Sequence, residues 1–190
     1  MTASASALRL DRSRCAFLLV DLQEKLAAAM QPEALARVEK NVVALVEGAR
    51  VLGVPLLITE QYPQGIGATL PAIRTALPEG IVPIEKVDFS CLAVPAVSSE
   101  LERLNRKQVV VAGMEAHICV YQTVRDLAAA GYQVFVPHDA VLSRADENRR
   151  VGLDLAARAG AVITATESVL FDLLGKAGTP EFKAVSRLIK

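Results

Sequence analysis

Six short apolar runs, separated by longer segments with helical patterning, constrain the fold of this chain more than any other feature. They are residues 15–20, 54–59, 81–85, 108–112, 132–136 and 161–164. Each run is rich in Val, Ile and Leu and nearly continuous, which is typical of strands covered on both faces. Strands that alternate with helices form parallel sheets between helical layers. The pattern predicts an α/β protein: a three-layer α/β/α sandwich around a central, mainly parallel six-stranded sheet.

The helical segments are identified by apolar residues spaced three and four apart. The clearest begins at Pro32, carries apolar side chains from Leu35 to Leu52, and ends at Gly53. A glycine directly after such a stripe is a common helix stop. Shorter helices are expected at residues 97–104, 119–130 and 147–159. The tail from Glu181 also has a helical apolar stripe, which either covers this domain or contacts a neighbouring subunit, so we expect a homo-oligomer.

Composition narrows the function classes. The chain has 190 residues, equal numbers of basic and acidic residues, 52% hydrophobic residues, three cysteines and two histidines. Zero net charge gives no general footprint for nucleic acid or anionic membrane. Three cysteines form no disulfide framework or zinc cluster, and two histidines argue against a histidine-rich metal site. We expect a cytoplasmic protein with a flexible segment at residues 1–13 and one domain over residues 14–190.

Three reactive side chains follow three of the expected strands. Asp21 follows the first strand, Lys86 the third, and Cys119 stands where the loop after the fourth strand enters a helix. Open parallel sheets place their sites beyond the carboxyl ends of the strands. The sequence therefore predicts that an acid, a base and a thiol meet at one rim of the sheet.

Each of these residues has a plain alternative role. A thiol at a helix N-terminus is expected to have a lowered pKa and to act as a nucleophile, but free cysteines usually pack as small hydrophobes. Asp21 is a candidate general base, or a helix cap. Lys86 is a candidate ion-pair partner for Asp21, or a solvated surface lysine. Cys15 and Cys91 lack such a setting and are interpreted as structural.

The motifs LLVDLQ, IEKVDFS and VVVAGMEAHICV carry a family resemblance in their order and spacing. The chain resembles the isochorismatase-like superfamily of cysteine hydrolases, which has a Rossmann-like topology and includes nicotinamidases, N-carbamoylsarcosine amidohydrolases and isochorismatases. TEQYPQG and GMEAHICVYQT are most similar to the branch called isochorismatase-domain-containing proteins. The resemblance covers nearly the whole chain from Arg14.

The resemblance implies a role for each residue that matches a family motif. Asp21 becomes the general base, Lys86 its electrostatic partner and Cys119 the nucleophile. A non-proline cis peptide is implied at Met114–Glu115, where it would aim the backbone N–H groups of Glu115 and Cys119 as an oxyanion hole. Metal-dependent nicotinamidases carry histidines after the second strand, whereas TEQYPQGIGATL has none. We therefore expect no metal and no cofactor.

Four further residues near the rim are candidates for binding a small-molecule substrate: Gln23, Tyr62, Phe89 and His117. Gln23 could equally be a solvated helix residue and Phe89 a core residue, while His117 could pair with Cys119 as a rival base. The expected activity is hydrolysis of a small amide or ureide through a covalent acyl-enzyme. The alternatives are vinyl-ether hydrolysis of an isochorismate-like substrate and a catalytically silent binding or scaffold protein.

Overall fold

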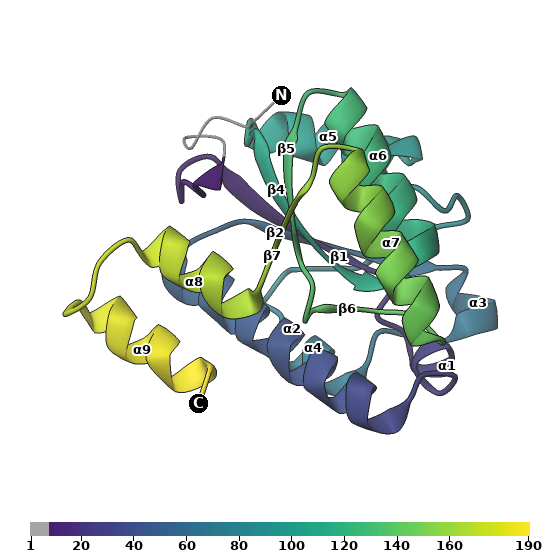
Figure 1. Cartoon of the computed structure of the whole chain (residues 1–190), viewed down its shortest axis with the longest axis horizontal. Coiled ribbons are helices and arrows are strands. Elements are labelled where there is room, and N and C mark those ends of the chain that lie inside the picture. The colour runs from purple at the N-terminus through teal and green to yellow at the C-terminus, as the bar shows by residue number, and fades with distance from the viewer. Residues whose placement is uncertain (1–7) are drawn as a thin grey trace.

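The structure is a computed structural model, and it describes residues 8–190 (Figure 1). The strands are β1 (Cys15–Val20), β2 (Leu56–Gln61), β3 (Ile84–Lys86), β4 (Gln108–Met114), β5 (Gln133–Pro137), β6 (Val141–Leu142) and β7 (Val162–Thr164). The α-helices are α1 (Glu24–Ala27), α2 (Pro32–Leu52), α3 (Pro63–Ile66), α4 (Pro71–Ala76), α5 (Pro95–Leu104), α6 (Tyr121–Ala129), α7 (Asp146–Arg158), α8 (Thr166–Leu174) and α9 (Pro180–Leu188). A 3-10 helix, η2 (Cys91–Ala93), and a π-helical turn, η3 (Ala116–Val120), complete the elements.

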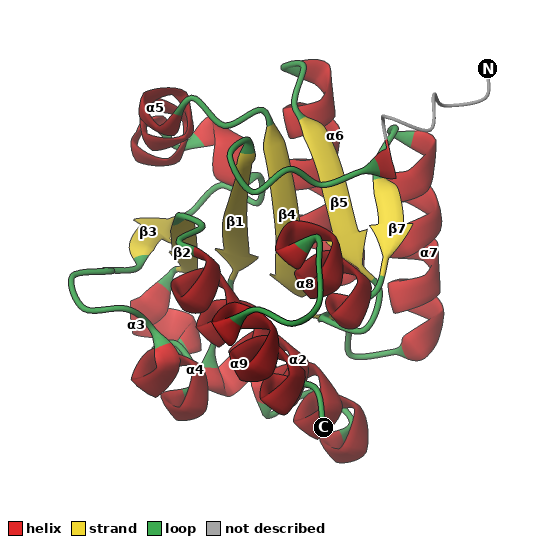
Figure 2. Cartoon of the chain, turned by 90° about the vertical axis from the view of Figure 1, so that its left-hand side faces the viewer, coloured by secondary structure: helices red, strands yellow, loops and turns green. Residues whose placement is uncertain are grey.

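All strand pairs of the sheet are parallel, in the order β3-β2-β1-β4-β5-β7 (Figure 2). The chain first adds β2 and β3 on one side of β1, then crosses back through α5 to place β4 on the other side. The carboxyl ends of β1 and β4 thus lie at the point where strand order reverses. Ligand sites of open α/β sheets form at such a point.

Strand β1 runs through the middle of the core, and every one of its side chains is buried. Phe17 and Leu19 pack into the core on the face covered by α2, α4, α8 and α9. Leu18 and Val20 pack into the core on the opposite face, beneath α5, α6 and α7 (Figure 1). Because successive side chains of a strand point to opposite faces, a continuous apolar run is what a strand between two helical layers requires.

The predicted three-layer α/β/α fold is confirmed, with seven strands rather than six over the described residues. The strand missed by the sequence analysis is β6, which pairs with the end of β4 through Gly113 and Met114. Two residues give too little periodicity to identify a strand. Strands β2 and β3 also begin later than predicted, after Pro55 and Pro83, because proline has no N–H to donate to the ladder.

Both ends of the described chain pack on the domain. Of the predicted flexible segment, residues 1–7 lie outside the described residues, while Leu10 is buried and its N–H donates to Asp172. The predicted C-terminal helix packs on its own chain: Val185 is fully buried in the core that contains α2, and Phe182 meets Phe171 of α8 edge to face at 6.2 Å.

Candidate active site

Asp21 is held at the carboxyl end of β1 by an abrupt change of backbone direction. Its φ of 51° is in the left-handed region, and its N–H donates to the carbonyl of Thr59 at 3.2 Å. On the other side β4 comes close, because a Cβ on Gly113 (φ 133°) would lie 2.0 Å from the carbonyl oxygen of Val20. Only glycine allows this approach. The ends of β1 and β4 are thereby brought together at the strand-order reversal.

Lys86 and Asp21 form a fully buried ion pair. Lys86 Nζ lies 2.6 Å from Asp21 Oδ2, and neither side chain is exposed. Lys86 Nζ also donates to Gln61 Oε1 at 2.6 Å and to the backbone carbonyl of Asp88 at 3.1 Å. An ammonium has three protons, so these acceptors use all of them. Lys86 is therefore a buried partner of Asp21 and not the solvated surface lysine considered as its alternative.

The carboxylate of Asp21 interacts with both Lys86 and Cys119. Thr59 Oγ1 donates to Asp21 Oδ1 at 2.8 Å, and the Cys119 thiol lies close enough to this carboxylate for each group to shift the pKa of the other. Burial raises the pKa of Asp21 above its ordinary value, while Lys86 and Thr59 act in the opposite direction. A carboxylate with a raised proton affinity is a better proton acceptor than an exposed aspartate.

Cys119 lies inside the π-helical turn η3 and not at the first residue of a helix, and it is only 7% exposed. The expected lowering of its pKa is wrong for the resting site. Burial is the largest cause and raises the pKa of Cys119, the nearby Asp21 charge raises it further, and Lys86 lowers it. Since a buried thiol facing a carboxylate keeps its proton, a base is needed to activate it.

The peptide bond between Met114 and Glu115 is cis, as the family resemblance implied. The pairing of β4 with β6 ends at Met114–Leu142, directly before Glu115. The Glu115 side chain is buried, and its Oε1 accepts from the backbone N–H and from Nε of Arg144, each at 3.1 Å. The segment that leads to Cys119 is thus attached to the loop after β6.

The four expected substrate-binding residues are not gathered in one cavity. Gln23 is fully buried, so it is not a solvated helix residue, and its amide is fully used: Oε1 accepts from Gln61 N–H, and Nε2 donates to the carbonyls of Gln61 and Gly67. Tyr62 is 52% exposed and lines a surface hollow of about 260 Å³ together with Lys86 and Val87.

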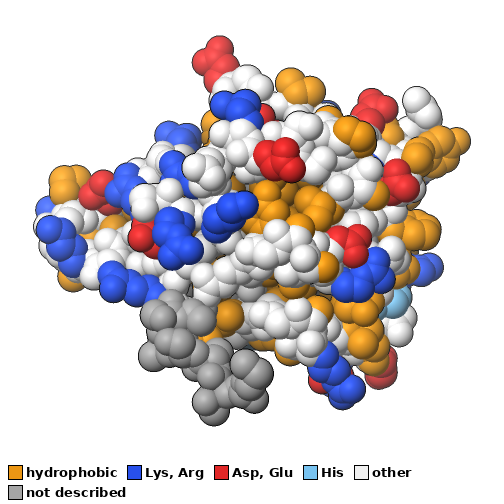
Figure 3. Space-filling view, turned by 90° about the horizontal axis from the view of Figure 1, so that it is seen from above, with side chains coloured by type: hydrophobic (Ala, Val, Ile, Leu, Met, Phe, Trp, Pro, Cys, Tyr) orange, Lys and Arg blue, Asp and Glu red, His pale blue; other side chains and the backbone are white. Residues whose placement is uncertain are grey.

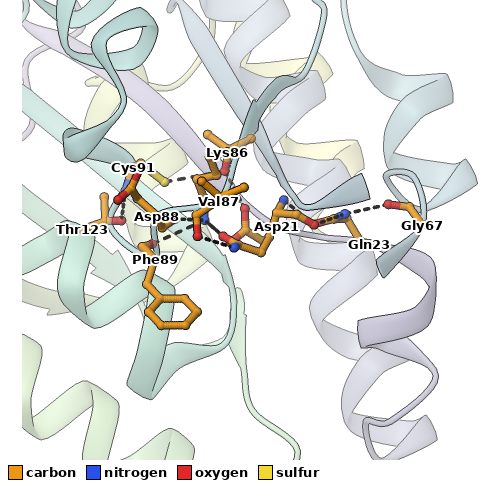
Figure 4. A network of polar contacts seen from close by, with 11 residues as sticks. Asp21, Gln23, Gly67, Lys86, Val87, Asp88, Phe89, Cys91 and Thr123 are labelled. Carbon is orange, nitrogen blue, oxygen red and sulfur yellow. Dashed lines mark hydrogen bonds and ion pairs between the residues drawn. The ribbon is translucent and has the colours of Figure 1, made fainter. Parts of the chain in front are cut away.

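Phe89 and His117 lie elsewhere around the site. Phe89 is 54% exposed, so it is not a core residue; its ring points away from the polar network and lines a second hollow (Figure 4). His117 Nδ1 lies 3.0 Å from Ser143 Oγ, which connects its ring to the loop after β6. Among the described residues, no hydrogen bond joins His117 to Cys119.

Two polar residues of the network, Thr59 and Gln61, have no role in the sequence-based prediction. Together with Gln23 they connect Gly67, Lys86 and Asp21 through one chain of hydrogen bonds (Figure 4). Both lie near the carboxyl end of β2, where Thr59 is in register with Val20 of β1. The strand-end rule that selected Asp21 applies equally to this strand, and Thr59 is the single hydroxyl at the end of its apolar run.

Cys91 and Cys15 differ in their distance from this network. Cys91 Sγ lies 3.6 Å from Thr59 Oγ1, and its N–H donates to Thr123 Oγ1 at 2.9 Å. Cys15 Sγ donates to the carbonyl of Ala16 at 3.7 Å, and burial raises the pKa of Cys15 to about 12. Cys15 therefore behaves as a buried structural cysteine, as expected.

Over residues 8–190, no group of three or more His, Cys, Asp and Glu side chains is arranged to hold a metal ion. None of the helices described here combines the length and apolar character needed to cross a bilayer. On the face drawn in Figure 3, Lys and Arg side chains lie among Asp and Glu side chains, as expected from zero net charge.

The parallel sheet between two helical layers, with a thiol, a carboxylate and an ammonium at its strand ends, defines an α/β protein with a hydrolase fold. The chain belongs to the isochorismatase family: the model of the isochorismatase domain matches residues 15–168. It is 36% identical over 173 residues to the isochorismatase domain-containing protein 2 of Bos taurus, covering 90% of this chain and 81% of that protein.

Two other relatives carry different names. The secreted isochorismatase effector Isc1 of Phytophthora sojae is 41% identical over 150 residues, which cover 77% of this chain and 71% of that protein. Among solved structures, the MAR1 ribonuclease of Caenorhabditis elegans superposes with a TM-score of 0.89 at 34% identity, covering 95% of this chain and 92% of that one. The chain therefore belongs to this family, whose members carry names that refer to different activities and locations.

Proposed function

We propose that this protein is a cofactor-independent cysteine hydrolase acting on a small carbonyl compound of the amide or ureide type. The observation that carries the proposal is the buried Asp21–Lys86 ion pair, whose carboxylate lies close enough to the Cys119 thiol to raise the pKa of that thiol. A thiol that keeps its proton at rest is useful as a nucleophile only if a base lies near it, and Asp21 is the candidate base.

In the first half of the reaction, Asp21 takes the thiol proton while Cys119 Sγ forms a bond to the substrate carbonyl carbon. The carbonyl oxygen becomes an oxyanion, which would accept hydrogen bonds from the backbone N–H groups of Glu115 and Cys119 in this mechanism. When the tetrahedral intermediate collapses, the C–N bond breaks and Asp21 returns the proton to the leaving amine. The product of this half is a thioester on Cys119.

In the second half, Asp21 accepts a proton from water, and the resulting hydroxide attacks the thioester carbonyl. The C–S bond then breaks, the acid leaves, and the proton on Asp21 returns to the sulfur. Lys86 contributes by holding Asp21 ionised in a buried position. Its protons are already used by Asp21, Gln61 and the carbonyl of Asp88, so Lys86 is not a substrate ligand in this mechanism.

Around these steps, Tyr62, Phe89 and His117 are the candidates for direct contact with substrate. Gln23, whose amide is fully engaged, would act through Gln61. Self-association, a cytoplasmic location and independence of metal ions stay predictions. Turnover that is unchanged by a chelator would support independence of metal ions.

The test is a panel of small amides, ureides and vinyl ethers, with RNA included because of the ribonuclease name of the C. elegans relative. Product formation and the intact mass of the protein are followed together. We expect a substrate of the amide or ureide class to add an acyl group to the wild type and none to C119S. C15S is the matched control and keeps both turnover and the acyl adduct, because Cys15 lies outside the network.

Each alternative function predicts a different result in this panel. Turnover of a vinyl ether that survives in C119S would replace the covalent mechanism with that of an isochorismatase. Cleavage of RNA without an acyl adduct would assign a phosphodiesterase activity. A scaffold protein would turn over nothing, and its Cys119 would react with iodoacetamide no faster than Cys91.

A further inference from the structure

Cys91 is a buried thiol in contact with the polar network around Asp21, and it has no part in the proposed mechanism. Its residue is fully buried, and its Sγ lies 3.6 Å from Thr59 Oγ1, which is within hydrogen-bonding distance for the large sulfur atom. The same Thr59 Oγ1 lies 2.8 Å from Asp21 Oδ1. The thiol of Cys91 is therefore separated from the candidate base by a single hydroxyl group (Figure 4).

The number of protons in this chain of contacts fixes the direction of its hydrogen bonds. Asp21 is paired with the Lys86 ammonium, so its carboxylate accepts hydrogen bonds and donates none. A hydroxyl has one proton, and Thr59 gives this proton to Asp21 Oδ1. Thr59 Oγ1 can therefore only accept in its contact with Cys91, and the thiol is the donor. The chain runs from the S–H of Cys91 through the O–H of Thr59 to the carboxylate.

The surroundings of Cys91 keep its thiol protonated. Burial is the largest cause that raises the pKa of Cys91, and the Asp21 charge raises it further, while Lys86 lowers it. The charged and titratable groups that act on Asp21 itself are Lys86 and Cys119. A thiol that keeps its proton at neutral pH stays available as a hydrogen-bond donor.

The backbone of Cys91 is attached to the helix that follows the candidate nucleophile. Its N–H donates to Thr123 Oγ1 at 2.9 Å, and Thr123 is fully buried on α6, which continues from η3 (Figure 4). Cys91 also belongs to the same buried apolar cluster as Val120 and Val124. These contacts fix the backbone from which the Cys91 thiol reaches Thr59.

We propose that Cys91 is a positioning residue, whose thiol donates to Thr59 Oγ1 and thereby holds the Thr59 hydroxyl toward Asp21. A hydroxyl that accepts a hydrogen bond becomes a stronger donor, so this chain stabilises the ionised carboxylate more than Thr59 does alone. The role goes beyond the structural one expected for Cys91 from the sequence. The inference rests on the proposed function only in treating Asp21 as the general base, because the proton affinity of Asp21 is measured without a substrate.

The test is the pKa of Asp21 in C91A, T59V and the double variant C91A/T59V. It is measured by carbon-13 NMR on protein labelled at the aspartate carboxyl carbon, and the Asp21 signal is identified by its loss in D21N. We expect C91A to raise this pKa by about 0.3–0.5, equivalent to roughly two- to threefold in proton affinity, because the carboxylate loses part of its stabilisation. In the T59V background, C91A should change the pKa by less than about 0.1, because the hydroxyl that transmits the effect is absent.

Three control variants separate the loss of the donor from the loss of side-chain volume. C91S differs from C91A only by a hydroxyl donor, so its Asp21 pKa should lie closer to that of the wild type. C91V fills the space of the thiol without a donor and should behave as C91A does, which also keeps the test valid if C91A fails to fold. C15A removes a fully buried thiol outside the network and should leave the pKa of Asp21 unchanged. Unfolding in urea confirms that each variant is folded.

An unchanged or lowered pKa of Asp21 in C91A overturns the inference, because the thiol would then not support the donor to the carboxylate. An equal rise in the wild-type and T59V backgrounds, or an equal rise in C91S and C91A, overturns it as well. If the pKa values behave as expected but no compound is turned over, the inference about Cys91 stands and the proposed hydrolase function fails. If turnover and the acyl adduct are found while C91A leaves the pKa unchanged, the proposed function stands and the inference fails.

Discussion

Replacing Lys86 by methionine tests whether the site depends on a buried ion pair. The substitution keeps most of the side-chain volume and removes the ammonium that contacts Asp21 Oδ2 at 2.6 Å with both side chains fully buried. Breaking a buried pair by removing one partner costs about 3–5 kcal/mol, because the other charge stays buried and uncompensated. For a chain of this size the loss corresponds to a fall in Tm of roughly 6–20 °C.

A matched control is available in the exposed pair Arg103–Glu100. Its N–O distance is also 2.6 Å, but its side chains are 69% and 35% exposed. We expect R103M to lower the free energy of unfolding far less than K86M does, because exposed pairs are solvated and screened. The comparison isolates burial, since the distance is the same in both pairs.

The stability loss in K86M should depend on pH, and the direction follows from the pKa of Asp21. Burial raises the pKa of Asp21 and Lys86 lowers it, so K86M raises it further. A carboxyl with a raised folded-state pKa destabilises the fold fully above that pKa, and the penalty vanishes as pH falls toward the ordinary aspartate value. The difference in free energy of unfolding between K86M and wild type should therefore be larger at pH 7 than at pH 4.

Urea unfolding, monitored by circular dichroism, measures the difference between K86M and wild type at pH 7 and at pH 4. D21N/K86M removes both charges and should recover much of the stability lost in K86M, which keeps the test valid if K86M alone fails to fold. A K86M loss no larger than that of R103M, or a gap that does not change between pH 7 and pH 4, would refute the reasoning.

Three further predictions concern the residues around this pair. D21N should lower turnover by about 10²–10⁴, and the acidic limb of the wild-type kcat/KM profile should lie above pH 3.8, since burial raises the pKa of the base; a limb at or below 3.8 argues against Asp21 as the base. Thr59→Val, which removes the donor to Asp21 Oδ1, should cost about 1–3 kcal/mol in urea unfolding and slow turnover; unchanged kinetics would mean that the hydroxyl does not position Asp21. Gly152→Ala should cost about 1–3 kcal/mol and lower kcat, because its Cβ would meet the Ala116 backbone at 2.5 Å. The control Gly48→Ala meets only the flexible end of a leucine side chain and should leave kcat unchanged; equal kcat in both variants contradicts the prediction.

The sequence determined the architecture of this protein and the place of its three reactive side chains. β1 and α2 have the predicted bounds, because a doubly buried strand and a one-sided helix each leave a local periodicity. The parallel alternation of strands and helices then brings Asp21 to one rim of the sheet with Lys86 and Cys119. This much follows from local patterning plus the rule that parallel strands end on the same side.

Only the tertiary structure decided the burial, the hydrogen-bond partners and the charged neighbours of those side chains. Thr59 reaches Asp21 only because β2 pairs with β1 in register, and Arg144 reaches Glu115 only because the short strand β6 pairs with β4. The raised pKa of Cys119 comes from burial and from the charge of Asp21, and neither leaves a periodic signal. Desolvation and charge pairing depend on distances between segments remote in sequence, so no local pattern encodes them.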